Sequence, residues 1–173
     1  MIPLVKKTWS PKGHRPVLNY KGPRQKVSLA SALCWKPGSK RIRFAYQTLV
    51  NKYFNNEKSA EFIKLILKKI PGKVIIVWDG GTMHKGDPIN ELKTKFAQRL
   101  TIEKFPPYAP MINPVEQIWG WLKYGKLSNF APQDAKHMNR VVQPTLVTME
   151  RNQERLRNFW SASELPLPRV LLF

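Results

Sequence analysis

The 173-residue chain is predicted to form an α/β domain in which helices pack on a mixed sheet. Segments with the two-residue period of strands alternate along the chain with segments that have the spacing of amphipathic helices. A continuous apolar run over residues 74–78 is too short for a helix and is typical of a strand buried on both faces. Hydrophobic residues make up 42% of the chain, which is enough for the packed core of one domain.

The first predicted elements form an antiparallel hairpin. Between Lys26 and Trp35 large side chains alternate with small ones, as in a strand with one bulky and one small face. Residues 36–39, Lys-Pro-Gly-Ser, have the composition of a turn. Residues 41–50 are therefore predicted to be the returning strand of the hairpin.

A helix, a strand, a second helix and a further strand are predicted next. Ser59 is the expected N-cap of the first helix, which has one apolar stripe for covering a sheet and ends at the Pro-Gly pair of residues 71–72. The apolar run over residues 74–78 is the expected central strand. Residues 88–99 predict a polar helix, and residues 100–105 predict another short strand.

The next part of the chain is predicted to be extended and then helical. Its prolines keep residues 105–110 extended, and Asn113 caps the helix that follows, with a proline at its first position. We expect Trp119 of this helix in the core and Trp121 against the C-terminal helices.

Beyond residue 132 the pattern is helical, with an interruption at the Gln-Pro pair of residues 143–144. We therefore expect residues 1–132 to form the sheet-containing domain. Residues 133–173 are expected to be a helical extension that packs on it.

The charge of the chain predicts a polyanionic partner. Thirty Lys and Arg against eleven Asp and Glu give a net charge of +19, which is typical of nucleic-acid-binding proteins. Residues 1–56 hold twelve of the basic residues and no acid. A solvated basic face that only aids solubility is the alternative. The candidate DNA contacts are Lys6, Lys7, Arg24, Lys26, Arg41, Arg43, Lys85 and Lys123.

The sequence also indicates where the protein acts. The longest stretch without a charged residue has 11 residues and four prolines, whereas a membrane-spanning helix needs about 20 apolar residues. The first twelve residues do not have the pattern of a secretion signal, and the single cysteine, Cys34, excludes an internal disulfide. We therefore expect no membrane partner and a cytoplasmic, nucleoid-associated protein.

Two acids lie at junctions between predicted elements. Asp79 directly follows the strand at residues 74–78, and Glu116 lies in the first turn of the helix capped by Asn113. Each has an ordinary structural explanation, because Asp-Gly-Gly is typical of a turn and Glu116 has the spacing of a capping box. However, ligands enter α/β sheets at strand ends, and two neighbouring carboxylates favour a divalent cation.

The segments around these acids resemble the DDE superfamily endonucleases, the transposases of bacterial insertion sequences related to the mariner elements. Residues 74–84, VIIVWDGGTMH, are similar to the strand that carries the second aspartate of the family. Residues 105–123, FPPYAPMINPVEQIWGWLK, are similar to its third-acid motif. The separation of 37 positions between Asp79 and Glu116 suits the family, and residues 2–13 resemble the segment after its first aspartate.

The resemblance implies a ribonuclease-H-like fold and the cleavage and joining of DNA strands in transposition. In this family three carboxylates hold two Mg²⁺ or Mn²⁺ ions, which activate water or a DNA 3′-hydroxyl. Asp79 and Glu116 correspond to two of these acids, and the resemblance gives His84 an accessory role. The implied partners are transposon ends, target DNA and a second copy of the chain.

The same resemblance implies that one catalytic acid is absent. The first aspartate of the family would lie upstream of Met1, and the chain has no acid before Glu57. We therefore expect a fold without its first strand and a truncated fragment that is inactive alone. Its expected partner is an upstream fragment with that aspartate and a helix-turn-helix. The alternatives are a non-catalytic DNA-binding remnant of a transposase and a ribonuclease or repair nuclease of the same fold.

Overall fold

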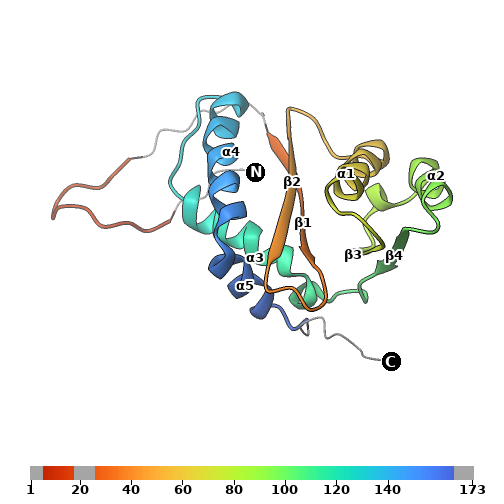
Figure 1. Ribbon diagram of the computed structural model, residues 1–173. Coiled ribbons are helices and arrows are strands. Elements are labelled where there is room, and N and C mark those ends of the chain that lie inside the picture. Colours follow the sequence, from red (N-terminus) through yellow and green to blue (C-terminus); the bar gives the residue numbers. More distant parts are fainter. Residues whose placement is uncertain (1–5, 18–25, 166–173) are drawn as a thin grey trace.

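The structure of the chain, a computed structural model, describes residues 6–17 and 26–165 (Figure 1). The described residues form two small sheets and five α-helices, which confirms the predicted α/β class. The main elements are β1 (Val27–Trp35), β2 (Ile42–Val50), α1 (Asn56–Lys69), β3 (Val74–Trp78), α2 (Asp87–Lys95), β4 (Leu100–Lys104), α3 (Pro114–Gly120), α4 (Ala135–Arg151) and α5 (Gln153–Ser161). Shorter helical turns are η1 (Thr82–His84), η2 (Pro110–Ile112) and the π-helical η3 (Trp121–Lys126).

The predicted hairpin is confirmed. β1 and β2 pair antiparallel, in a register that runs from Val27 opposite Val50 to Trp35 opposite Ile42. The small face of β1, formed by alanines and Cys34, packs against α1, and the bulky face packs against the C-terminal helices. Figure 1 accordingly shows the hairpin between α4 and α5 on its left and α1 on its right.

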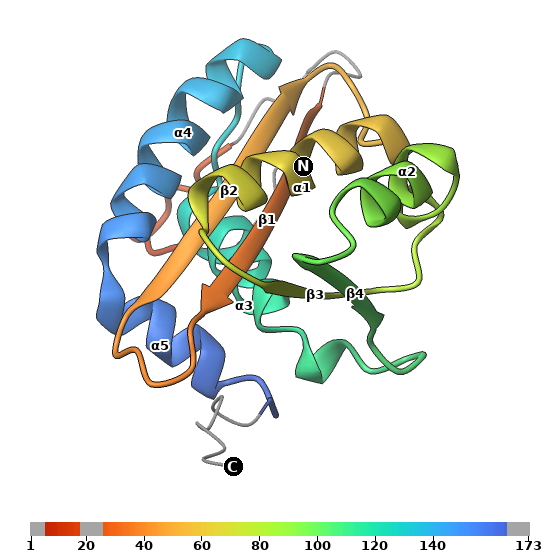
Figure 2. The same ribbon diagram turned by 45° about the vertical axis from the view of Figure 1, so that its right-hand side comes forward.

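Helix α1 contacts both sheets. Phe62 and Ile66 pack against the hairpin, while Ile63 and Leu67 pack against residues of α2, β3 and β4. Figure 2 shows α1 lying across the hairpin, with α2 beside it. The predicted apolar stripe therefore covers a sheet, and it links the two sheets to each other.

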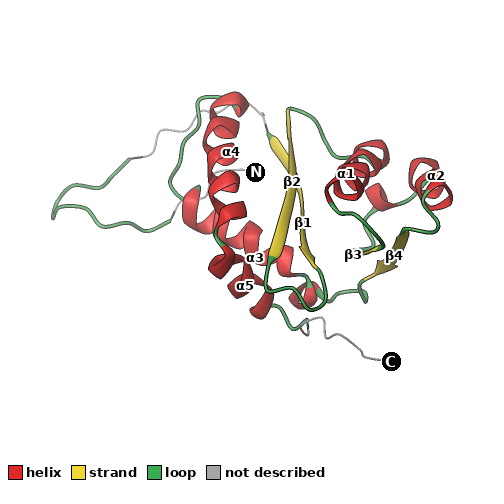
Figure 3. Ribbon diagram, in the orientation of Figure 1, coloured by secondary structure: helices red, strands yellow, loops and turns green. Residues whose placement is uncertain are grey.

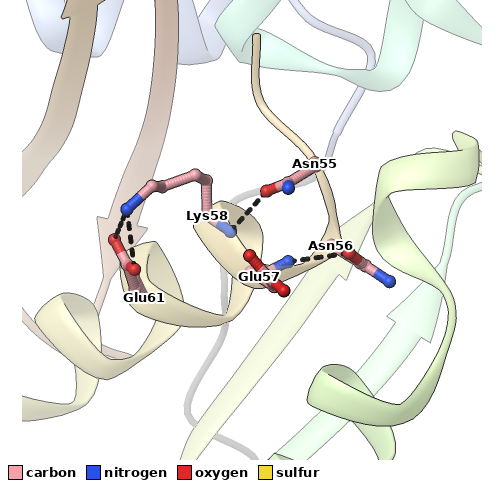
Figure 4. A network of polar contacts seen from close by, with 5 residues as sticks. All are labelled: Asn55, Asn56, Glu57, Lys58 and Glu61. Atoms are coloured by element: carbon pink, nitrogen blue, oxygen red, sulfur yellow. Dashed lines mark hydrogen bonds and ion pairs between the residues drawn. The ribbon is translucent and has the colours of Figure 1, made fainter. Parts of the chain in front are cut away.

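The predicted start of α1 at Ser59 is wrong. Asn55 is the N-cap, and its side-chain oxygen accepts a hydrogen bond from the Lys58 amide at 2.9 Å (Figure 4). Lys58 also pairs with Glu61, at 2.7 Å between Nζ and Oε2. The helix starts earlier because an asparagine side chain caps free amides as well as serine does. Ser59 is instead buried within the helix.

The prediction that the strand at residues 74–78 is buried on both faces is wrong. The face of β3 with Val74, Ile76 and Trp78 packs against apolar residues of α1 and α2. The other face exposes Ile75 and Val77, whose exposed fractions are 69% and 46%. Within the described residues, no helix packs over this second face.

The single mixed sheet predicted from the sequence is divided into two (Figure 3). β3 and β4 pair parallel, whereas β1 and β2 pair antiparallel. In the part of the chain that the structure describes, β1 pairs only with β2 and β3 only with β4. Both pairing directions of a mixed sheet are present, but β3 is not a central strand here.

Helix α2 is shorter than predicted and ends at Lys95 rather than at Arg99. The Arg99 guanidinium donates to the carbonyls of Leu67 and Ile70, at 3.2 and 3.1 Å. These carbonyls lie at the C-terminal end of α1. The last carbonyls of a helix accept no hydrogen bond within it, so a basic side chain there can donate to them. Arg99 therefore serves as a cap for α1 and leads the chain into β4.

Helix α4 runs through Pro144, where an interruption was predicted. The proline removes one backbone hydrogen bond, but a continuous stripe of buried side chains extends to both sides of it. The buried residues of this stripe are Met138, Val142, Leu146 and Met149. No helix in the described part of the chain is long and apolar enough to cross a membrane.

Candidate active site

Asp79 lies in a turn at the end of β3. Strand pairing continues beside it, because the Phe105 amide donates to the Trp78 carbonyl at 2.8 Å. Asp79 Oδ1 accepts a hydrogen bond from the Gly81 amide at 2.9 Å, which is the turn contact expected from the sequence. The same oxygen lies 3.2 Å from His84 Nε2. The contacts found among the described residues thus leave Oδ2 available to a ligand.

His84 is held beside Asp79 by ring stacking. Its imidazole lies on the indole of Trp78, with 4.1 Å between the ring centroids and 21° between the planes. Burial lowers the pKa of His84, and the charge of Asp79 only partly opposes this shift. The lowered pKa favours the neutral ring, whose Nε2–H can donate to Asp79 Oδ1. This contact orients the carboxylate.

Glu116 lies in the first turn of α3, which Asn113 caps as predicted. Asn113 Oδ1 accepts a hydrogen bond from the Val115 amide at 3.2 Å. The capping-box alternative is not observed, because the Asn113 amide donates to the Pro110 carbonyl at 3.0 Å instead of to the Glu116 carboxylate. The Glu116 side chain is therefore not used to start this helix.

The charges of Asp79 and Glu116 act on each other. Burial raises the pKa of Glu116, and the negative charge of Asp79 raises it further. A divalent cation would remove this repulsion. Within the described residues, no group of three or more His, Cys, Asp or Glu side chains is placed to hold a metal ion. Carboxylate oxygens are the ligand type that hard divalent cations use.

Trp119 does not lie in the core, contrary to the prediction. The core positions of this segment are taken by Ile118 and Leu122, which are fully buried and four residues apart. Trp119 is half-buried and lines a groove. Trp121 packs edge-on against Phe159 of α5, with 6.3 Å between the ring centroids, as expected.

Five of the candidate DNA-binding residues have side chains that a ligand could reach. Lys26 and Lys123 are brought together in the groove that Trp119 lines. Lys7, Arg41 and Lys85 are exposed and lie on separate segments. The basic residues thus form one local pair and several scattered positions.

The other three candidates differ from this pattern. Lys6 donates through its backbone amide to Asn129 and through Nζ to the Tyr124 carbonyl, at 2.7 and 3.3 Å. Arg43 donates to the Lys69 carbonyl at 3.0 Å and so caps the end of α1. Both side chains therefore have structural roles. Arg24 lies outside the described residues.

Gly81 is a site residue that sequence reasoning missed, because Asp-Gly-Gly only indicates a turn. A Cβ atom at Gly81 would lie 2.9 Å from Asp79 Oδ1 and 3.4 Å from the ring of His84. Such a contact forces the Asp79 side chain to move. At Gly80, a Cβ atom would meet nothing within 4 Å.

We therefore expect Gly81→Ala to weaken Mn²⁺ binding by about 10-fold, because it displaces the carboxylate that is predicted to bind the metal. The free energy of unfolding should change by no more than about 0.5 kcal/mol, since a short side chain at the surface can shift cheaply. The matched control is Gly80→Ala. Titration of Mn²⁺ followed by its electron paramagnetic resonance signal measures the effect, and equal affinities in the two variants would contradict this geometry.

Residues 2–139 match the family model described as DDE superfamily endonuclease. The matched range contains both carboxylates, His84 and the four strands of the described residues. No curated protein matches the chain.

Proposed function

Because the chain belongs to the DDE superfamily endonucleases, we propose that it is the catalytic part of a transposase, which cuts DNA strands and joins them to new sites. Family membership indicates a nuclease or transposase that acts on DNA. The α/β architecture, with small sheets flanked by helices, is that expected of a ribonuclease-H-like DDE domain. The observation that supports the proposal is that the charge of Asp79, at the end of β3, raises the pKa of Glu116 on α3.

In this proposal Asp79 and Glu116 hold Mg²⁺ or Mn²⁺. A bound divalent ion supplies a Lewis acid for the phosphodiester and lowers the pKa of an attacking water or hydroxyl. Neighbouring residues of the chain orient these two carboxylates. Gly81 and His84 fix one oxygen of Asp79, and the cap at Asn113 fixes the start of the helix that carries Glu116.

A further proposal concerns a third acid. Two ions need more carboxylate oxygens than Asp79 and Glu116 supply. β1 and β3 each have an edge without a partner among the described strands, and such edges accept added strands. An upstream transposase fragment that carries this aspartate and, on its N-terminal side, a helix-turn-helix would complete the site.

The organisation of the protein follows from the same proposal. Residues 1–132 would form the catalytic domain, and residues 133–173 would be a helical extension. The complete enzyme would act in the cytoplasm as a homodimer on transposon ends and target DNA.

We expect DNA binding that depends strongly on salt and little on sequence. The net charge is +19, and Lys7 and Arg41 are exposed on different segments. Each phosphate contact should add about −0.9 to the slope of log affinity against log salt concentration on duplex DNA. Charge reversal at Lys7 together with Arg41 should weaken binding to all sequences about equally. Fluorescence anisotropy in a salt series measures this, and an affinity that salt does not change would contradict it.

A strand-joining assay tests the proposed function. The chain is fused behind an extended segment that carries an aspartate, and it is mixed with Mn²⁺, supercoiled plasmid and a labelled oligonucleotide with a free 3′-hydroxyl. Label joined to the plasmid, and lost in Glu116→Ala, is the expected result. Cutting without joining would indicate a nuclease. DNA binding with neither reaction would indicate the non-catalytic remnant.

A further inference from the structure

A groove of about 480 Å³ is lined in part by Met83 and Trp119, which come from the segments that carry His84 and Glu116. It is formed where the start of β1, the segment after β2, the turn η1 and the junction of α3 with η3 meet. Its volume is within the range of pockets that bind small molecules. The side chains that give it its chemistry are Lys26, Tyr53, Phe54, Met83, Trp119 and Lys123.

Two residues that line the groove are close in sequence to residues of the acid site. Met83 directly precedes His84, whose Nε2 lies 3.2 Å from Asp79 Oδ1. Trp119 lies one helical turn after Glu116 on α3, so the two side chains emerge from neighbouring positions. A ligand with one end in the groove can therefore have its other end at the carboxylates.

The lining combines aromatic surface with positive charge. Tyr53 has an exposed fraction of 75%, and the Lys26 ammonium lies over its ring. Met83 has an exposed fraction of 39%, and Trp119 belongs to none of the core clusters found among the described residues. All the charged residues of the lining are lysines. Lysines next to stacking rings are typical of sites that bind single-stranded nucleic acid.

We propose that this groove receives one unpaired DNA base, next to the phosphodiester that Asp79 and Glu116 bind. The base stacks on Tyr53 and Trp119, while Lys26 and Lys123 contact the adjoining phosphates. This inference rests on the proposed function, because it takes DNA as the substrate of the acid pair. The backbone of a peptide segment has no negative charge to pair with Lys26 and Lys123, whereas every DNA phosphate has one. Charge therefore favours DNA.

Binding of two DNA duplexes tests the groove. One duplex is blunt, and the other has a short single-stranded 3′ end with 2-aminopurine as its first unpaired base. We expect the wild-type chain to bind the tailed duplex about 10-fold more tightly, because each stacked base strengthens binding by about this factor or more. Stacking should also quench the 2-aminopurine fluorescence.

Variants of Tyr53 test whether the preference for the tailed duplex comes from the groove. Tyr53→Ala should lose most of the 10-fold preference and of the quenching, whereas Tyr53→Phe, which keeps the ring, should retain both. Tyr124→Ala is the matched control, since Tyr124 is 55% exposed and lies outside the groove lining. Circular dichroism confirms that each variant is folded.

The remaining outcomes separate the two proposals. If both duplexes bind equally, or Tyr53→Ala keeps the preference, the groove proposal is overturned while the proposed function stands. A protein segment would then be the remaining occupant. If neither duplex binds, both proposals are overturned.

Discussion

The 173-residue chain alone is expected to nick supercoiled plasmid in Mn²⁺ no faster than its Asp79→Ala and Glu116→Ala variants. The proposed site has two carboxylates, and a metal ion held by so few protein oxygens keeps most of its water and binds weakly. Small misplacements of reacting groups cost on the order of 100-fold in rate. The same chain fused to an extended segment with an aspartate should therefore nick at least about 100-fold faster.

Two control reactions complete this experiment. The fused chain with Asp79→Ala should return to the background rate, which shows that the gain depends on the native site. A fused segment with asparagine in place of its aspartate should give no gain. Rapid nicking by the unfused chain, abolished by Asp79→Ala and by Glu116→Ala, would show that the two acids suffice.

Ile118→Ala is expected to lower the free energy of unfolding by about 3 kcal/mol. Ile118 is fully buried in the main core cluster, and replacing a buried isoleucine by alanine removes apolar contacts and leaves a cavity. Urea denaturation measures the change. Because Ile118 lies two residues after Glu116 on α3, the same variant should also bind Mn²⁺ less tightly.

The matched control for this core substitution is Val147→Ala on α4. Val147 has an exposed fraction of 37%, so its replacement should change the free energy of unfolding by no more than about 0.5 kcal/mol. Equal losses at the two positions would contradict the packing of α3 against the hairpin and the C-terminal helices.

The local features of the fold could be predicted because each depends on neighbouring residues. Alternation over residues 27–35 gives the strand and its two faces, and the Asn-Pro pair at residues 113–114 gives the start of α3. Asp79 and Glu116 were predicted as site residues in the same way, since each directly adjoins a predicted element. That they form one site stays a prediction, made from strand ends and from the family resemblance.

Several of the errors depend on contacts between distant segments. The apolar run at residues 74–78 does not show that one face of β3 lacks a covering helix. Pro144 predicts a break, but burial of Val142 and Leu146 on both sides of it maintains α4. The groove was missed because its side chains come from four separate segments, and no local pattern joins them.

The most direct test of the central claim is Mn²⁺ binding by the wild-type chain and by variants that each lack one acid. The claim is that Asp79 and Glu116 together form one divalent metal site. Asp79→Ala and Glu116→Ala should each weaken binding by at least about 10-fold, while Glu91→Ala, which removes an exposed acid of α2, should leave it unchanged. Equal Mn²⁺ affinity in all four proteins would contradict the claim.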